Sequence, residues 1–329
     1  MKNIKKHMVY RFSGMLLTAC IFLMCFSVYV VKADEIMEYV CNGLIYVLDV
    51  EEETAVLMGS ESASLTKLKI PAAIVYDGKE FPIVGIEDYA FEGSSLKSAK
   101  LGANISYIGE GAFAFSEKLK SVNIPKGCKK IDVAAFFMCK KLAKVSLNKK
   151  SVLSEIGSGA FAGTAIKEFV IPNATVEIQD ATFAECKSLK SVTIGKKLKT
   201  IGEGAFAGCN ELSIVSISKK NKNFTVDENV IYNNDHTELI SGAAASGDYK
   251  IGEGTIRISS RAFEGNEKIV SVEVPDSLEY VGEGAFMGCT SLAELRIIGG
   301  LKELSDNAFY GIEGLKLVQV AQGEDQYED

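Results

Sequence analysis

One pattern recurs along most of the chain and limits what it can fold into: an Ile-Gly pair, then Ala-Phe, then Leu-x-x-Val-x-Ile. The phenylalanines that mark successive copies are Phe91, Phe113, Phe136, Phe161, Phe183, Phe206, Phe263, Phe286 and Phe309. They are separated by 22, 23, 25, 22, 23, 57, 23 and 23 residues, so the period is about 23. A period of roughly 20–50 residues is typical of a solenoid, in which each unit buries its apolar face against its neighbours. We therefore predict a repeat array.

Each copy contains one segment that alternates like a short strand with a single buried face, as at Leu119, Val122 and Ile124. Strands stacked from about nine copies predict one parallel sheet over residues 86–320. The glycine after the isoleucine, as at Gly109 and Gly202, suits a tight turn.

The segments on either side of the array lack the repeat. Residues 34–85 are strand-rich and contain turn signals such as Asn42-Gly43, so they are predicted to form an N-terminal β cap on the exposed end of the core. Residues 321–329 form an acidic tail.

An insertion interrupts the array between Phe206 and Phe263, where one unit of 23 is followed by 34 further residues. Two strand-like runs flank Asn233-Asn234-Asp235 within residues 221–242. This pattern predicts a β-hairpin, near residues 221–250, that projects from the solenoid.

Residues 1–33 are predicted to be an export signal. Basic residues precede an apolar run from Met15 to Val31, and Val31-Lys32-Ala33 places small residues at −3 and −1 of a cleavage site. An uncleaved membrane anchor is an alternative, because about 17 apolar residues just span a bilayer. Leu17-Thr18-Ala19-Cys20 resembles a lipoprotein box, although the apolar run continues beyond Cys20. The protein is therefore expected to be secreted or held at the cell surface.

The charge of the chain excludes one class of partner. The formal net charge is −7 and would become −12 without the five basic residues of the first 33 positions. Nucleic-acid binding needs a basic surface to neutralise phosphates, so we predict no nucleic-acid partner.

The full order Ile-Gly-x-x-Ala-Phe-x-x-Cys-x-x-Leu-x-x-Val-x-Ile, nearly complete in residues 201–217 and 281–297, resembles the BspA-like leucine-rich repeat proteins of bacteria and some protozoa. We predict their fold, a curved right-handed horseshoe with the parallel sheet on the concave face and short helical turns and loops behind. The resemblance implies a secreted or surface protein that acts in adhesion and protein–protein recognition, including attachment to host matrix proteins.

Six cysteines remain after the first 33 residues, and four of them follow the repeat phenylalanine by three positions: Cys139, Cys186, Cys209 and Cys289. Ser116 occupies the same column in another copy. A recurring small slot facing the core explains this column better than disulfides do. Cys41 and Cys128 lie outside the column and are not assigned.

Nothing in the sequence supports catalysis, a metal or a cofactor. His236 is the one histidine after residue 33, and no second group is placed to form a nucleophile–base pair with it. The Gly-x-Gly-Ala-Phe segments lack the third glycine position of a dinucleotide fingerprint and recur once per unit, which indicates a structural corner. We predict a non-enzymatic protein.

A column of lysines is the main candidate binding feature. The residue after the first strand Leu or Ile is lysine in five of the nine units: Lys97, Lys120, Lys167, Lys190 and Lys316. We expect a basic stripe on the exposed sheet face, either for an acidic partner or sulfated glycan, or simply to keep the strands soluble. Asn123, Thr193 and Arg296 belong to a neighbouring polar column that would add specificity on the concave face.

We therefore predict a binding module whose first-choice partner is a host extracellular-matrix or other cell-surface protein. The alternatives are an envelope-associated structural protein that assembles with other copies, and a carbohydrate-binding module. The absence of tryptophan weakens the carbohydrate alternative.

Overall fold

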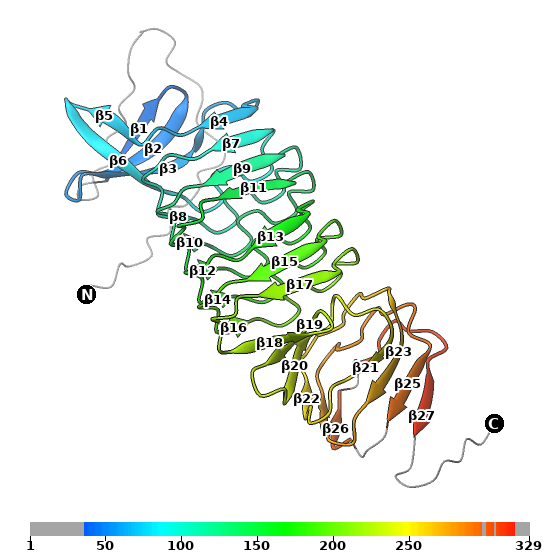
Figure 1. The fold of residues 1–329 in the computed structure, drawn as a ribbon. Helices are drawn as coiled ribbons and strands as arrows, with labels where there is room; N and C mark the ends of the chain where they lie inside the picture. The colour runs from blue at the N-terminus through cyan, green and yellow to red at the C-terminus, as the bar shows by residue number, and fades with distance from the viewer. Residues whose placement is uncertain (1–35, 298–300, 306, 320–329) are drawn as a thin grey trace.

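The computed structural model describes residues 36–297, 301–305 and 307–319 of the chain. These residues form a β-solenoid that extends from a β cap near the N-terminus to the last repeats, with no helix (Figure 1). Accordingly, the described segments contain no helix that could cross a membrane. The predicted signal of residues 1–33 and the tail of residues 321–329 lie outside the described residues.

One face of the solenoid carries the Leu-x-x-Val-x-Ile strands, which we call the long-strand face. Its strands are β4 (Lys67–Lys69), β7 (Ser98–Lys100), β9 (Ser121–Ile124), β11 (Lys144–Leu147), β13 (Glu168–Val170), β15 (Ser191–Ile194), β17 (Ile214–Ile217), β21 (Gly247–Lys250), β23 (Ile269–Val274), β25 (Glu294–Ile297) and β27 (Lys316–Gln319). They pair in parallel as β4-β7-β9-β11, β13-β15-β17 and β21-β23-β25-β27. The predicted parallel stacking is therefore confirmed, but in three successive sheets.

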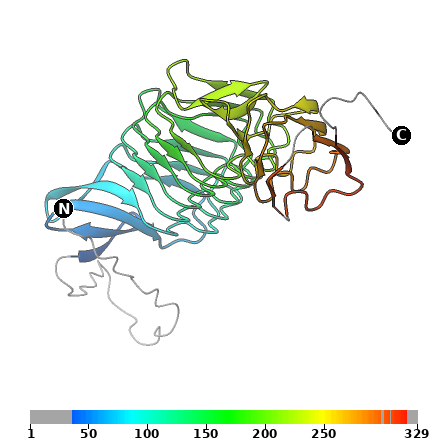
Figure 2. The ribbon, with the colours of Figure 1, turned by 90° about the horizontal axis from the view of Figure 1, so that it is seen from below.

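A second parallel ladder, which the sequence did not predict, forms the opposite face. Its two-residue strands are β8 (Tyr107–Ile108), β10 (Lys130–Ile131), β12 (Glu155–Ile156), β14 (Glu177–Ile178), β16 (Thr200–Ile201), β22 (Arg257–Ile258), β24 (Tyr280–Val281) and β26 (Glu303–Leu304). They carry the isoleucine, or a similar apolar residue, that precedes the corner. Hydrogen-bonded turns, rather than the predicted helical turns, connect this short-strand face to the Ala-Phe corner (Figure 2).

The repeat phenylalanines stack along the solenoid axis inside the core. Ring centroids of Phe113 and Phe136 are 5.2 Å apart with planes 2° apart, and Phe183 and Phe206 are 5.6 Å apart at 2°. This offset-parallel spacing is a favourable aromatic geometry. Backbone bonds accompany it, such as Phe113 N–H to the Ala135 carbonyl at 2.8 Å. Each unit thus contacts only its neighbours, as the period predicts.

The glycine after the isoleucine is required for a different reason from the one predicted. A Cβ on Gly202 would lie 2.3 Å from the backbone nitrogen of Asp180, and one on Gly157 would lie 2.5 Å from that of Val133. Consecutive units approach too closely here for a side chain. Close stacking, and not a left-handed turn, therefore explains this glycine.

The N-terminal cap continues the short-strand face. β1 (Ile36–Cys41), β2 (Leu44–Asp49) and β3 (Thr54–Ser60) form an antiparallel meander. β3 then pairs in parallel with β6 (Lys79–Ile86), which pairs with β8, while β5 (Ala73–Tyr76) forms a hairpin with β6. The cap buries Tyr46, Leu48 and Phe81 against the first repeats.

The insertion does not project as predicted, because it is built into the stack. β18 (Phe224–Asp227), β19 (Val230–Asn233) and β20 (Glu238–Ser241) form an antiparallel meander, and β20 pairs in parallel with β22. Ile231 packs in the core of the preceding repeats, whereas Val230 and Tyr232 pack in the core of the following ones.

The stack of phenylalanines is interrupted at this insertion. Phe206 ends one stack, and Phe263 begins another that continues to Phe286 at 4.7 Å. Gly242 lies over the ring of Phe263, since a Cβ on this glycine would be 2.0 Å from the ring. We call the repeats before the insertion, with the cap, the first array, and the insertion with the repeats after it the second array. The two arrays have separate buried apolar clusters, but Phe224, Ile231, Ala243 and Ala244 of the insertion pack in the cluster of the first array.

Candidate functional site

The start of the long-strand face carries a cluster of lysines that we call the basic face. It comprises six exposed lysines of β4, β7, β9 and β11 or the residues directly before them: Lys67, Lys69, Lys97, Lys100, Lys120 and Lys144. Strand register brings them together, because Lys69 is paired with Lys100 and Lys67 with Ser98. Adjacent strands lie about 4.8 Å apart, so these charges are spaced closely across the sheet.

No acidic side chain is interleaved with the basic face. Residues 66–70, 97–101, 120–124 and 143–147 contain no aspartate or glutamate. None of the six lysines forms an ion pair within the described part of the chain, whereas lysines elsewhere do, such as Lys140 with Glu117 at 2.7 Å. The basic face is therefore a concentration of unpaired positive charge on an acidic protein.

The predicted lysine column is only partly continuous. Lys120 N–H donates to the Lys97 carbonyl at 2.9 Å, and Lys190 N–H to that of Lys167 at 2.7 Å, so each pair sits side by side. The sheet is interrupted between β11 and β13, and the two pairs belong to different sheets. Lys190 also lies 3.9 Å from the Glu211 carboxylate. The densest charge thus surrounds Lys97 and Lys120.

The other predicted residues of this face are already engaged or are displaced. The Asn123 side chain bonds both backbone groups of Leu101, at 2.9 and 3.3 Å. Thr193 bonds Ser216 at 3.1 Å, and Arg296 pairs with Glu294. Lys316 is in register with Glu294, one position away from the lysine column, so the column does not extend to it.

Lys67 and Lys69 were missed because their strand was assigned to the cap. Residues 65–71, LTKLKIP, nevertheless fit the Leu-x-x-Val-x-Ile-Pro pattern, with Leu68 at the buried valine position. That match was the signal that the long-strand face begins at β4, ahead of the first repeat phenylalanine.

The long-strand face of the second array is neutralised by its own side chains. Lys250 pairs with Glu273 at 3.0 Å and with Glu253 at 3.5 Å, and these carboxylates raise the pKa of Lys250. Asp248 accepts a hydrogen bond from Ser271 at 2.7 Å. This sheet therefore mixes acidic with basic side chains, and Lys316 is its one lysine without an ion pair within the described residues.

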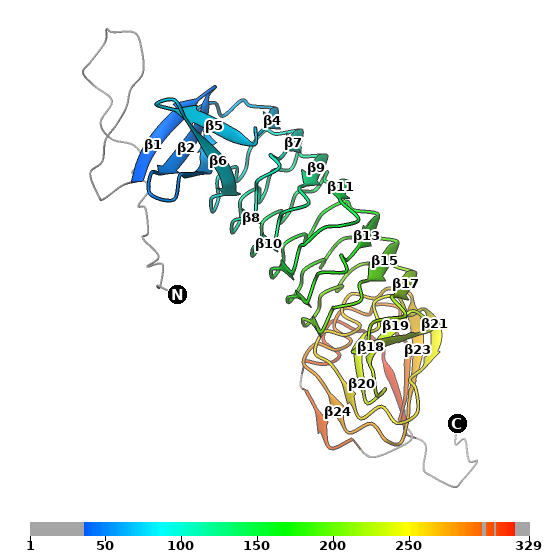
Figure 3. The same cartoon turned by 60° about the vertical axis from the view of Figure 1, so that its left-hand side comes forward.

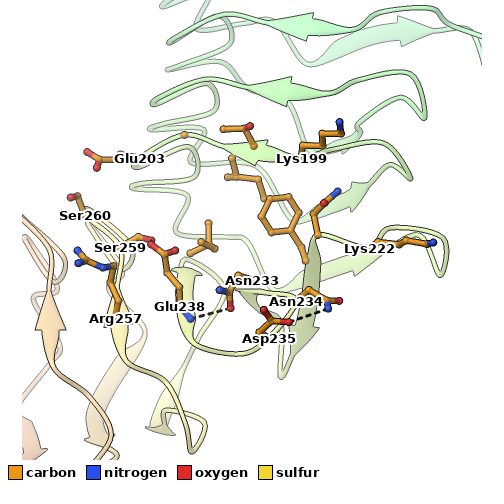
Figure 4. A pocket seen from close by; sticks show the side chains of 16 residues that line it. Lys199, Glu203, Lys222, Asn233, Asn234, Asp235, Glu238, Arg257, Ser259 and Ser260 are labelled. Atoms are coloured by element: carbon orange, nitrogen blue, oxygen red, sulfur yellow. Dashed lines mark hydrogen bonds between the residues drawn. The ribbon is translucent and has the colours of Figure 1, made fainter.

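A polar groove of about 620 Å³ lies at the junction of the two arrays, on the side of the short strands (Figure 4). Lys199 and Glu203 of the first array line one side of the groove, and Glu238, Arg257 and Ser259 of the second array line the other (Figure 4). Several of these groups satisfy one another, since Ser259 donates to Glu238 at 2.9 Å. Arg257 stacks over the ring of Tyr280 at 4.7 Å. The groove is a second, less charged candidate.

The cysteine column is structural. Cys139, Cys186, Cys209 and Cys289 are free and buried, and their thiols donate to the carbonyl of an earlier repeat phenylalanine at 3.0–3.1 Å. Ser116 makes the same bond to Phe91 at 2.8 Å. Each thiol is thus a hydrogen-bond donor that joins two units, which the predicted small apolar slot did not include.

The remaining titratable candidates also have structural partners. His236 lies in the turn between β19 and β20, bonded to Thr225 at 2.9 Å and stacked on Tyr232. Cys128 is free and buried, and burial raises its pKa to about 12; Cys41 is free and half-buried. Within the ranges that the structure covers, no three His, Cys, Asp or Glu side chains are grouped to hold a metal ion.

Solved structures support the fold. The chain is similar to a leucine-rich cell surface protein of Faecalibacterium prausnitzii, with 23% identity, a TM-score of 0.65, and coverage of 87% of this chain and 89% of that one. It is also similar to the pneumococcal vaccine antigen PcpA, at 20% identity and a TM-score of 0.63, with 86% and 81% covered. A leucine-rich repeat protein of Bacteroides ovatus matches at 22% identity and 0.56, with 86% and 90% covered.

No curated protein matches the chain in a sequence search. The model of the BspA type leucine rich repeat region matches in six copies, over residues 60–189, 154–242 and 247–327. These ranges cover most of the chain and include both arrays, and the first begins ahead of β4. The resemblance inferred from the repeat is confirmed, and the chain belongs to the BspA-type leucine-rich repeat family.

Proposed function

We propose that this protein is exported and acts at or beyond the cell surface as an adhesion protein, which binds a host matrix or other cell-surface protein through its basic face. Membership of the family supports a protein-interaction scaffold in general. The export pattern of residues 1–33 and the description of one structural relative as a cell surface protein support the location.

The basic face is the observation that carries the proposal. A parallel sheet with a packed core presents its side chains on a rigid surface, so little conformational entropy is lost when a partner binds. Unpaired lysines attract an acidic partner and increase the rate of encounter, and salt weakens this attraction. Within the described residues, the long-strand face of the second array is not comparable, because Glu273 and Glu294 pair with basic side chains of that sheet.

Binding of the protein to a panel of matrix proteins would test the proposal. We expect saturable binding that weakens as salt is raised and that falls at least tenfold in the variant Lys97→Ala/Lys100→Ala/Lys120→Ala. The matched control Lys196→Ala/Lys197→Ala removes two exposed lysines from a turn after β15 and should bind normally. Binding that is identical in all three proteins would contradict a site on the basic face.

A further inference from the structure

The first strand of the long-strand face has a free edge. Among the described strands, β4 pairs with β7 alone. Lys97 N–H donates to the Thr66 carbonyl at 2.7 Å, and Ile70 N–H donates to that of Lys100 at 2.9 Å. Backbone groups alternate in direction along a strand, so those of residues 66, 68 and 70 face β7. The N–H and C=O groups of Lys67 and Lys69 therefore point to the opposite side, where none of the described strands pairs with them.

A pocket of about 400 Å³ lies beside this free edge. It is lined by residues of β4, the β1–β2 hairpin and β5, and by none of β7. The strands β1, β2 and β5 lie on the side of β4 away from β7 (Figure 3), so the pocket is on the unpaired side of β4. Leu44, Tyr46, Leu68 and Ile74 are buried residues that line it. Burial raises the pKa of Tyr46 to about 12, so its hydroxyl remains neutral. The floor of the pocket is mainly apolar.

The outward side chains of the same strand are charged. Lys67 and Lys69 are exposed on the basic face and have no ion pair with any described residue, while Leu68 between them turns toward the core and the pocket. β4 therefore offers three features along one edge: unpaired backbone groups, the charged side chains of Lys67 and Lys69, which also line the pocket, and the apolar floor of that pocket.

We propose that β4 binds an extended segment of the partner protein as an additional strand of the long-strand face. Successive side chains of a strand point to opposite faces. A segment paired with β4 would place every second side chain beside the lysines and the others over the pocket. The partner segment is accordingly one in which acidic and apolar residues alternate. This inference rests on the proposed function and names the chemistry of the bound segment.

Protection against aggregation and glycan binding each account for only part of what β4 offers. Lysines on an edge strand often serve to prevent edge-to-edge aggregation, but that role needs no apolar pocket beside the edge. A sulfated glycan would pair with the lysines, yet it would use neither the pocket nor strand-spaced backbone donors and acceptors. Strand addition uses all three features, since main-chain bonds give affinity and side-chain pockets give specificity.

Synthetic peptides test the proposal without altering the protein. The probe is a fluorescent ten-residue peptide of alternating Glu and Val, and the control has the same composition arranged as one Glu block and one Val block. Fluorescence anisotropy should show saturable binding of the alternating peptide and at least tenfold weaker binding of the block peptide. Equal affinities would show attraction of any polyanion and would overturn the inference.

N-methylation of the peptide tests the backbone bonds directly. One peptide is methylated at every Val and another at every Glu, so that each loses the N–H groups along one edge. Strand addition predicts that one of the two loses binding at least tenfold while the other retains it. Loss of binding by the peptide methylated at Val indicates parallel addition, and loss of binding by the peptide methylated at Glu indicates antiparallel addition. Equal affinities of the two methylated peptides would exclude a strand.

Two charge-reversal variants locate the site on the protein. Lys67→Glu/Lys69→Glu should weaken the alternating peptide at least tenfold, whereas Lys196→Glu/Lys197→Glu should not. If heparin binding depends on Lys67 and Lys69 and the peptide does not bind, a glycan would be the favoured ligand and the inference would be overturned. If the peptide fails but a matrix protein still binds through Lys97, Lys100 and Lys120, the proposed function stands and only strand addition is wrong.

Discussion

The two arrays begin in the same way. In the first, the meander β1-β2-β3 leads into the short-strand face and β4 opens the long-strand face; in the second, β18-β19-β20 and β21 do the same. The pairing register shifts next to a buried tyrosine in both, between Ile45 and Tyr46 and between Ile231 and Tyr232. The insertion is thus a second copy of the cap architecture, which ends one core and starts another.

The arrays differ in what they expose at that start. The positions of Lys67 and Lys69 in β4 correspond to Asp248 and Lys250 in β21, which are engaged by Ser271 and Glu273. The architecture of the two starts therefore matches, whereas the charges on it do not, and the proposed binding role falls to the lysines of the first array alone. If the two arrays are as separate as their cores, a substitution in one should leave the other unchanged.

Truncation of one stacked phenylalanine should have the largest effect and should be confined to one array. Phe113→Ala removes a buried ring between Phe91 and Phe136 and should cost about 3–5 kcal/mol. Hydrogen exchange followed during a urea titration should show the loss in residues 98–217, with residues 269–297 unchanged. Phe286→Ala should give the reverse. A shared loss in both variants would mean that the arrays unfold as one cooperative unit.

A methyl group at the junction should destabilise the second array. Gly242→Ala would place a Cβ 2.0 Å from the Phe263 ring, and overpacking of this kind costs about 1–3 kcal/mol. Gly127→Ala is the control, because the nearest atom to its Cβ is 3.8 Å away. Hydrogen exchange of residues 257–281, monitored as the temperature is raised, would measure the difference in stability between the two variants. Equal stability of both variants would argue that the junction adapts freely.

Sequence reasoning recovered the periodic part of this molecule and missed the parts that depend on three-dimensional stacking. The repeat predicts a strand with one buried face, and the structure confirms it with Val122 and Ile124 buried in β9, while Leu119 is buried just before the strand. The two-residue strands were missed because a pair such as Lys130-Ile131 is too short to show any period. The hairpin of the insertion is confirmed by the antiparallel pair β19 and β20, but its predicted projection was wrong, because the pattern does not tell which core covers Val230 and Tyr232.

The candidate site was recovered in part for a similar reason. Equivalent residues of successive units can be aligned from the sequence only where the boundaries of the units are known. Lys97 and Lys120 were therefore predicted, whereas Lys67 was not, because its segment was predicted to belong to the cap. The displacement of Lys316 follows from a pairing register, which the phenylalanine spacing alone does not fix. The lysines of the basic face lack ion pairs within the described residues because of their side-chain geometry, and a sequence pattern does not contain that geometry.

Alkaline pH should weaken the first array through its thiols. Burial raises the pKa of Cys139 to about 12 from 9.0, so its stabilising effect is complete below pH 9 and is lost as pH rises from 9 toward 12. The thiol ionises in this range in the unfolded chain but not in the folded one. The free energy of unfolding therefore falls by about 1 kcal/mol between pH 9 and 10. Cys139→Ser retains a donor, as Ser116 does, and should remove that part of the slope.

A buried cysteine of the second array provides the control for this pH effect. Cys289, in the second array, also has a pKa raised to about 12 by burial. Cys289→Ser should flatten the pH dependence of exchange in residues 269–297 and leave residues 98–217 as they were. An unchanged slope in both variants would show that ionisation of other groups, such as the buried Tyr232 and Tyr249, governs alkaline unfolding.

The smallest effect expected comes from the corners, where the first array carries strain that the second mostly avoids. Ala134 and Ala181 have φ of 53° and 52°, in the left-handed region, where Gly284 stands at the same place in the second array. A Cβ costs about 1–2 kcal/mol in this conformation, and the added freedom of glycine in the unfolded chain offsets roughly half of that. Ala134→Gly should therefore stabilise the first array by about 0.5–1 kcal/mol in urea unfolding, whereas Ala135→Gly, at a buried neighbour without positive φ, should destabilise it. If both substitutions destabilise, the methyl group of Ala134 stabilises the protein more by packing than it destabilises it by backbone strain. The alanines in left-handed conformation in the first array would then be no less stable than the glycines at the same positions in the second.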